Sequence, residues 1–353
     1  HFSVENKGAF FARRKNKFIP QRKYVITPLG ACEAGLIGEI RSHLIELQVV
    51  DEVIYSEALT NYIESYKKPG IEVFTRLNPS LREYQYDVIR KGLDQGRGVC
   101  VLGTGAGKTL TTAALIESYF QESANKDTFK CLLIVPDLGL VTQTHKEFIQ
   151  YGVSFKLTTW TGKHVPDLTS NVIICNIGIL QSRFEENEWV KFVDLLIVDE
   201  AHKIKSSNKI SKIVTQVKTP HTYGFTGTLP EDQIDKWSIV GKFGPILYEK
   251  SSYELRNEDF LVNVVVKCLD INYKSKPRRL SKNAYRDELE FINTNEFRNN
   301  LIYTLCERIN NNTLVLVNYI KHGQLLFDTL SKMNKQVFFI RGEVEVVERD
   351  KIK

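Results

Sequence analysis

A glycine-rich segment carries the clearest chemical signal in the sequence. It lies between an apolar run that ends at Leu102 and an amphipathic helical pattern, and it consists of Gly103, Thr104, Gly105, Ala106, Gly107, Lys108 and Thr109. Glycines permit a tight loop whose backbone N–H groups converge on phosphate oxygens at a helix N-terminus. Lys108 would reach the β- and γ-phosphates of a nucleotide, and Thr109 would ligate Mg²⁺. The strict phosphate-loop pattern has glycine where this chain has Leu102, so the alternative is a turn with an exposed lysine. The flanking elements favour the phosphate loop.

An acidic pair follows the apolar run 195–198. Asp199 and Glu200 would end a buried strand, 91 residues beyond Lys108. A carboxylate at that end of a parallel strand is well placed to hold a metal beside a phosphate loop. Asp199 would organise Mg²⁺, and Glu200 would orient or deprotonate the attacking water. A solvated acidic turn is the alternative, and the shared sheet favours catalysis.

Two weaker patterns flank these motifs. Thr226, Gly227 and Thr228 end the next apolar run, where short hydroxyl groups could relay the state of ATP to a neighbouring site. Upstream of the glycine-rich segment, Gln85 could read the edge of an adenine ring, with Arg82 or Tyr84 supporting the base. Spacing alone makes a capping or surface role for this second group nearly as plausible.

Short apolar runs alternate with helical periods through the middle of the chain, which predicts a parallel, doubly wound sheet. The expected strands cover residues 98–102, 131–135, 154–158, 172–175, 195–198 and 222–226, and the expected helices 81–95, 108–121, 139–151 and 210–218. A second α/β pattern follows, with expected strands at 262–269, 313–317 and 336–340 and helices at 295–310 and 321–333. Three strands make an incomplete doubly wound domain.

The composition is that of an ordinary globular protein, with 353 residues, 42% of them hydrophobic. Its 48 lysines and arginines exceed its 42 acidic residues by six, and the first 24 residues alone hold seven bases against one acid. No apolar run is long enough to span a membrane, and no apolar segment follows the early bases as in a secretory signal. The six cysteines lie far apart, so we expect reduced thiols and neither a disulfide framework nor a zinc site.

The ordered set of motifs resembles superfamily 2 helicases and nucleic-acid translocases. The matching positions are Arg82 with Gln85, the segment 103–109, Val135 with Pro136, the Asp-Glu-Ala-His box at 199–202, and 226–228. In that family the phosphate loop often lacks its first glycine. The resemblance implies tandem RecA-like motor domains that bind ATP and Mg²⁺ between them, with His202, Thr226, Gly227 and Thr228 coupling hydrolysis to movement. It also implies nucleic-acid contacts at Pro136, Gln143, Thr161, Gly162, Asn318 and His322.

At a finer level the chain is similar to phage UvsW-like recombination helicases, which drive branch migration and unwind D-loops or R-loops. We therefore expect branched, duplex or single-stranded DNA as partner, no membrane, a monomer, and a cytoplasmic location, in the host if the protein is phage-encoded. We call the positively charged residues 1–24 the basic lead. Within it, Arg13, Arg14, Lys15 and Lys17 would contact DNA phosphates. Alternatives are a DEAH-type RNA helicase, a restriction-enzyme motor subunit, and a nucleotide-gated DNA-binding module that never translocates.

The expected fold is α/β, with two tandem RecA-like doubly wound domains, the second incomplete, behind a small α+β domain. The expected boundaries are a basic N-terminal domain at 1–66, a linker at 67–80, the first motor domain at 81–250 and the N-terminal part of the second at 251–353. The family's glutamine–arginine element, which supplies an arginine finger, does not occur in this sequence. We therefore expect a part of a longer protein that binds ATP and DNA and hydrolyses ATP weakly.

Overall fold

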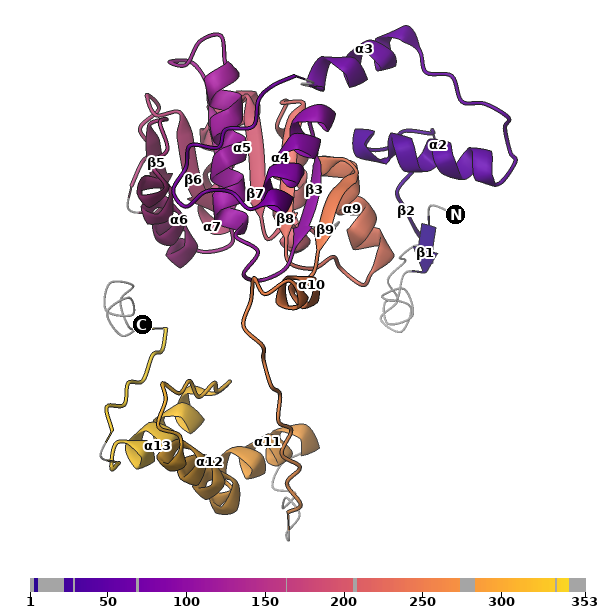
Figure 1. The fold of residues 1–353 in the computed structure, drawn as a ribbon. Coiled ribbons are helices and arrows are strands. Elements are labelled where there is room, and N and C mark those ends of the chain that lie inside the picture. Colours follow the sequence, from indigo (N-terminus) through magenta and orange to yellow (C-terminus); the bar gives the residue numbers. More distant parts are fainter. Residues whose placement is uncertain are drawn as a thin grey trace. The chain divides into compact units, whose positions relative to one another are not determined.

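The computed structural model describes residues 3–5, 22–27, 29–67, 70–162, 164–205, 208–273, 283–333 and 335–342. The chain divides into two compact units, residues 1–263 and residues 264–353, and each has its own fold (Figure 1). Within these described ranges, every helix is too short or too polar to cross a bilayer.

A seven-stranded, entirely parallel sheet organises the first unit. Its strands run in the spatial order β5 (Leu157–Trp160), β6 (Val172–Asn176), β4 (Cys131–Val135), β7 (Leu195–Asp199), β8 (His221–Thr226), β3 (Gly98–Leu102) and β9 (Ile246–Lys250). β4 is apolar along its whole length, and β7 is apolar up to Asp199, because both faces of these strands are covered. The predicted doubly wound α/β fold is therefore confirmed for this unit.

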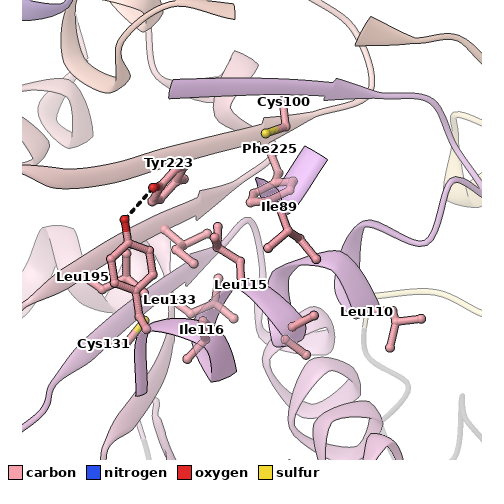
Figure 2. Packing of buried hydrophobic residues seen from close by; sticks show 14 of the residues in the cluster. Ile89, Cys100, Leu110, Leu115, Ile116, Cys131, Leu133, Leu195, Tyr223 and Phe225 are labelled. Atoms are coloured by element: carbon pink, nitrogen blue, oxygen red, sulfur yellow. Dashed lines mark hydrogen bonds between the residues drawn. The ribbon is translucent and has the colours of Figure 1, made fainter. Parts of the chain in front are cut away.

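Six helices cover the two faces of the sheet. One face packs against α4 (Glu83–Gln95), α5 (Lys108–Glu122) and α6 (Leu138–Tyr151), and the other against α7 (Ile177–Arg183), α8 (Lys209–Gln216) and α9 (Gln233–Phe243). Successive strand residues alternate between the faces, so Leu133 joins the first core and Leu132 the second. Figure 2 shows the first core, where Leu115 and Ile116 of α5 pack near Leu133 and Leu195.

The predicted elements of this unit hold with one shift and several additions. The strand expected at 154–158 begins at Leu157, because the backbone N–H and the hydroxyl of Ser154 donate to the Glu117 carboxylate of α5. That side-chain contact takes the place of a ladder bond at the start of the segment. Four further elements lie outside the predicted ranges: α7, α9, β9 and α10 (Ser252–Asn257).

The residues before the sheet form a hairpin and three helical segments. β1 (Ser3–Glu5) pairs antiparallel with β2 (Arg22–Tyr24), followed by the 3₁₀ turn η1 (Ala34–Leu36), α2 (Ile37–Glu46) and α3 (Glu57–Tyr66). The four basic residues predicted to contact DNA, Arg13, Arg14, Lys15 and Lys17, lie outside the described residues. The separation of residues 1–66 as a domain of their own stays a prediction.

The described part of the second unit contains three helices, α11 (Ala284–Thr294), α12 (Glu296–Arg308) and α13 (Ile320–Leu330). The strands expected at 262–269, 313–317 and 336–340 are wrong, because none of these described segments pairs with another strand. A strand exists only where its N–H and C=O groups meet a neighbouring ladder. The apolar pattern of these segments is present without such a partner.

Candidate nucleotide-binding site and nucleic-acid surface

The glycine-rich loop joins the carboxyl end of β3 to the first turn of α5. Gly107 is the N-cap of α5 and has a φ of 73°, in the left-handed region that favours glycine. A Cβ at this position would lie 2.5 Å from Gln85 Nε2. The loop therefore depends on glycine at Gly107 both for its backbone conformation and for the space beside α4.

The start of α4 holds the phosphate loop from one side. Gln85 Nε2 donates to the carbonyl of Ala106 at 2.9 Å and to that of Gly107 at 3.4 Å, while its Oε1 accepts from Arg82 N at 2.9 Å. The hydroxyl of Tyr84 also donates to Ala106 O, at 2.7 Å, and accepts from Arg82 Nη1 at 3.1 Å. The structure thus brings Arg82 and Gln85 to the loop, where Gln85 acts on backbone carbonyls. Its reading of adenine stays a prediction.

Lys108 and Glu200 meet across the end of β8. Lys108 Nζ lies 3.9 Å from Glu200 Oε1 and donates to Leu102 O at 3.2 Å. β8 lies between β3 and β7, so the Lys108 side chain, which follows β3 at the start of α5, reaches over the end of β8 to Glu200. Gly227 occupies that end, and a Cβ there would sit 3.8 Å from Lys108 Nζ. Two motifs that are distant in the sequence therefore form one site.

The backbone of Glu200 has a φ of 51°, which is uncommon for a residue other than glycine. This conformation turns the chain from β7 into the 3₁₀ turn η4 (Ala201–Lys203). Left-handed non-glycine residues cost about 1–3 kcal/mol and persist where the surrounding structure holds them. The conformation places the Glu200 carboxylate between Lys108 and His202.

A hydrogen-bonded chain connects Glu200 to the end of β8. His202 Nδ1 lies 3.1 Å from Glu200 Oε2 and 2.9 Å from Thr226 Oγ1, and Thr226 Oγ1 donates to Thr228 O at 2.8 Å. Since the hydroxyl has one proton and gives it to Thr228, His202 Nδ1 must be the donor to Thr226. The structure thus brings together the four residues expected to couple hydrolysis to movement.

Asp199 lies at the end of β7 with its carboxylate largely out of water. Burial raises its pKa to about 6, and the neighbouring Glu200 charge adds to the shift. Asp199 Oδ1 accepts from Glu200 N at 2.9 Å. A desolvated carboxylate together with the Thr109 hydroxyl is a set of hard oxygen donors, which fits Mg²⁺. The described residues contain no cluster of three or more His, Cys, Asp or Glu side chains suited to a metal.

Four of the predicted nucleic-acid contacts belong to the part of the first unit beyond β7, and three of them directly follow the carboxyl ends of strands. Pro136 follows β4, exposed Gln143 stands on α6, and Thr161 and exposed Gly162 follow β5. The other two belong to the second unit. Asn318 precedes α13, whereas His322 is buried within that unit and its Nε2 lies 3.1 Å from Asn299 Oδ1. A buried imidazole does not offer itself to a nucleic-acid backbone, so DNA contact by His322 stays a prediction that this placement does not favour.

Sequence reasoning missed the segment that borders the phosphate loop from the far side. Ser252 Oγ of α10 donates to Thr104 O at 3.3 Å, and a Cβ on Gly105 would lie 2.5 Å from a methyl group of Leu261. The guanidinium of Arg82 lies over the Phe260 ring at 4.7 Å. A capping box, in which Ser251 and Glu254 exchange hydrogen bonds, was the sequence signal for α10.

Residues 78–231 match the protein-family model described as "Type III restriction enzyme, res subunit". The ATP-dependent DNA helicase uvsW of Enterobacteria phage T4 is 24% identical over 279 residues, which are 76% of this chain and 55% of that protein. The DNA 3'-5' translocase XPB2 of Sulfurisphaera tokodaii is 28% identical over 244 residues, 68% of this chain and 49% of that protein. The chain spans about half the length of these curated relatives.

Solved structures agree in fold. The crystal structure of the UvsW helicase from Bacteriophage T4 matches with a TM-score of 0.54 at 20% identity, covering 70% of this chain and 90% of that one. A second crystal structure of T4 UvsW gives 0.52 at 20% identity, covering 99% and 71%. The resemblance drawn from the motifs is confirmed: the chain is similar in sequence and in fold to the UvsW helicase of phage T4.

Proposed function

We propose that the chain is the motor of an ATP-dependent DNA helicase or translocase that remodels branched DNA, by branch migration and by unwinding D-loops or R-loops, in recombination, repair and replication. The observation that carries the ATP-dependent part is the approach of Lys108 Nζ to Glu200 Oε1, 3.9 Å, across Gly227. A cation from the phosphate loop and a carboxylate from the next motif then face one reaction centre. Similarity to uvsW supports the branched-DNA part.

In this proposal the chain's residues bind and orient the nucleotide. Backbone N–H groups of the loop and Lys108 hold the phosphates, and Thr109 and Asp199 hold Mg²⁺, which supplies charge neutralisation at the phosphate oxygens. Lys108 Nζ lies between Leu102 O and Glu200 Oε1. Phosphate oxygens compete for the ammonium group, which frees the Glu200 carboxylate to orient a water molecule.

His202 carries this change to β8. Its Nδ1–H is shared between Glu200 Oε2 and Thr226 Oγ1. When Glu200 turns to water, the imidazole proton goes more fully to Thr226, whose own proton is held by Thr228. The end of β8 therefore receives the state of the nucleotide as a rearranged hydrogen bond.

The first prediction tests the two residues that meet. Lys108→Ala should weaken ATP binding and abolish DNA-stimulated hydrolysis, whereas Glu200→Gln should retain ATP binding and lower turnover by about 10²–10⁴-fold. Binding of a fluorescent ATP analogue and release of phosphate are measured in parallel. Lys126→Ala, an exposed lysine on the same unit, is the control. Normal DNA-stimulated hydrolysis in Lys108→Ala would overturn the site assignment.

The nucleic-acid partner is tested by comparing substrates. Forks and four-way junctions should bind more tightly and stimulate hydrolysis more than plain duplex DNA or single-stranded RNA. Equal or stronger stimulation by RNA would favour the RNA-helicase alternative. Light scattering of the same sample tests the proposed monomer. A strand-displacement assay separates a helicase from a nucleotide-gated binding module, because a binding module would displace no strand.

A restriction-enzyme motor subunit is the second candidate, and the description of the matching family model favours it. Such a motor serves a nuclease, so ATP-dependent cleavage of unmodified DNA is the distinguishing activity. We propose branched-DNA remodelling first because uvsW matches over 76% of the chain. Specific cleavage by the chain or its natural full-length form would reverse that order.

A further inference from the structure

The residues ahead of the motor are docked on helix α9 by close backbone contact. The turn η1 packs against the C-terminal part of α9, and a Cβ added to Gly35 would overlap the Val240 carbonyl oxygen. In return, a Cβ added to Gly241 would lie 2.6 Å from Glu33 Oε2. Each segment therefore presents a glycine to the other, and the close packing at both glycines leaves little freedom to slide.

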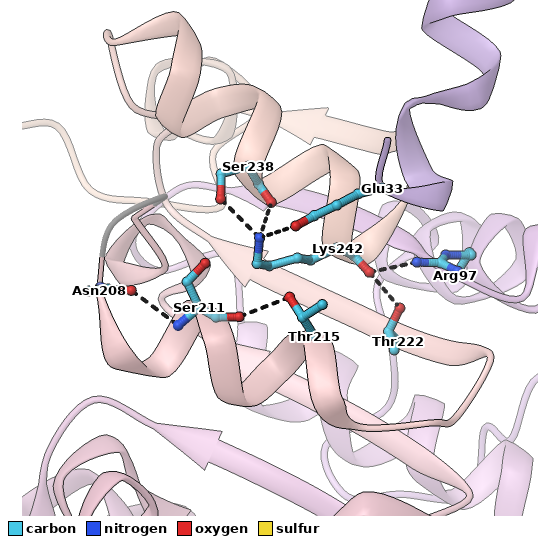
Figure 3. Close-up of polar contacts among 8 residues, drawn as sticks. All are labelled: Glu33, Arg97, Asn208, Ser211, Thr215, Thr222, Ser238 and Lys242. Atoms are coloured by element: carbon cyan, nitrogen blue, oxygen red, sulfur yellow. Dashed lines mark hydrogen bonds and ion pairs between the residues drawn. The ribbon is translucent and has the colours of Figure 1, made fainter. Parts of the chain in front are cut away.

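An ion pair locks this contact. Lys242 Nζ lies 2.7 Å from Glu33 Oε1 and donates also to Ser238 Oγ at 3.1 Å, as Figure 3 shows. The Lys242 side chain is only 5% exposed. Glu33 Oε2 is buried without a hydrogen-bond partner among the described residues. Because the Lys242 side chain is largely out of water, removal of the Glu33 carboxylate would leave the ammonium group without its charge partner.

The same end of α9 is fixed to two strands of the sheet. The Lys242 carbonyl accepts from Arg97 Nη2 at 2.6 Å and from Thr222 Oγ1 at 3.2 Å (Figure 3). The Phe243 carbonyl accepts from Arg97 Nε at 3.3 Å. Arg97 directly precedes β3, and Thr222 belongs to β8. These are the strands whose other ends carry the phosphate loop and Thr226.

The opposite side of α9 supports the catalytic turn. Phe243 and Ala201 both pack on Gly224 of β8, where an added Cβ would lie 3.0 Å from each of them. Ala201 opens the turn η4 that also carries His202, directly after Glu200. One helix thus has the N-terminal segment on one side and, through Phe243, the cluster that contains Ala201 on the other.

We propose that the contact of residues 33–36 with α9, which we call the clamp, positions the catalytic turn, with Glu33 and Lys242 as the positioning pair. Loosening the clamp then slows ATP hydrolysis without weakening ATP binding. Hydrolysis and binding should respond differently because the two sets of contacts lie on opposite faces of the sheet. The contacts that hold the phosphate loop come from α4 and α5 on one face of the sheet, and α9 with η4 lies on the other. The inference rests on the proposed ATP hydrolysis.

The test compares Glu33→Gln with Glu39→Gln, a matched change at an exposed glutamate of α2. We expect Glu33→Gln to lower kcat by about 2- to 30-fold, the range of coupling through a packed element, with KM for ATP unchanged and Glu39→Gln at the wild-type value. Gly35→Ala, which undocks η1 sterically, should give the same split. The double variant Glu33→Gln with Lys242→Gln should lose no more than the more affected single variant, because both members act through one contact.

Hydrogen exchange supplies a readout that does not depend on turnover. Peptides over residues 199–205 and 233–243 should exchange faster in Glu33→Gln than in the wild type and in Glu39→Gln. If the wild-type chain hydrolyses no ATP, the proposed function is wrong. Faster hydrogen exchange of residues 199–205 in Glu33→Gln would support the clamp in that case as well. Wild-type exchange at 199–205 in both Glu33→Gln and Gly35→Ala would overturn the inference, as would a rise in KM without a fall in kcat.

Discussion

Both polar atoms of the Gln85 side chain form hydrogen bonds with the backbone. Its amide donates to Ala106 and Gly107, and its carbonyl accepts from Arg82 N. The side chain is 2% exposed, so each of these bonds lies where water does not compete. If Gln85 reads adenine as the motif predicts, its amide must exchange a loop carbonyl for the base. ATP binding and loop geometry would then be linked through one side chain.

We predict that Gln85→Ala lowers ATP affinity by roughly 10-fold, because the loop loses two donors and the base loses its reader. The preference for ATP over GTP should disappear in the same variant. Competition binding measurements with ATP and GTP determine both the ATP affinity and the preference for ATP. Asp87→Ala, on the exposed side of α4, serves as control. Equal losses for ATP and GTP would show that Gln85 acts on the loop alone.

For individual residues of the site, the sequence predicted which residue types take part but not which of them touch one another. The phosphate loop and the acidic pair were identified because glycines at a strand-to-helix junction and carboxylates after a buried strand have few other uses. The bond from Tyr84 to Ala106 and the cover supplied by Leu261 were not predictable. Such contacts depend on how separate elements pack, which spacing along the chain does not encode.

Helix α13 shows a buried titratable group at the scale of an element. His322 lies inside the second unit with Asn299 of α12 at its Nε2. Burial lowers the pKa of this imidazole, and the nearby Arg298 charge lowers it further. The folded unit therefore prefers the neutral ring, while the unfolded chain takes up a proton at about pH 6.5.

We predict that α13 loses stability as the pH falls below about 6.5, since the unfolded state then binds a proton that the folded state resists. The loss should level off below the lowered folded-state pKa. Protection factors for residues 320–330 at pH 7.5 and pH 5.5 measure it. His322→Asn should remove the difference, whereas His145→Asn, on α6 of the first unit, should leave it. A pH-independent α13 in the wild-type chain would contradict the prediction.

The strand predictions succeeded or failed by the same physics. In the first unit, near-continuous apolar runs such as 131–135 are buried on both faces and paired on both edges. In the second unit, the run 313–317 has a similar pattern and pairs with no strand in the described part of the chain. Hydrophobic pattern indicates what a segment would bury, and only long-range pairing decides whether it becomes a strand.

Charge is distributed unevenly over the whole molecule. The surplus of six positive charges equals the surplus within the first 24 residues, so the remainder of the chain is balanced. A balanced motor gives little long-range attraction to DNA, whereas a basic lead attracts phosphates without regard to base sequence. The lead therefore has the composition expected of an arm that contacts DNA.

We predict that replacing Arg13, Arg14 and Lys15 with Ala weakens duplex binding and flattens its salt dependence. Each lost phosphate contact should reduce the slope of log affinity against log salt by about 0.9, so three contacts remove about 2.7. Fluorescence anisotropy across a salt series measures this slope. Replacing Lys91, Lys126 and Lys218 changes the net charge equally and should leave the slope nearly unchanged. An unaltered salt slope in the variant without Arg13, Arg14 and Lys15 would contradict DNA contact by these residues.

The strand order of the sheet has a consequence for synthesis of the chain. β3 carries the phosphate loop and is made first among the strands of the sheet, yet it pairs only with β8 and β9, which are made last. About 120 residues separate the end of β3 from the end of β8. At about 5–20 residues per second, a ribosome needs roughly 6–24 s to supply the partner. During that time an apolar strand stands with both edges open, so the nascent chain is most exposed to aggregation before its nucleotide site can exist.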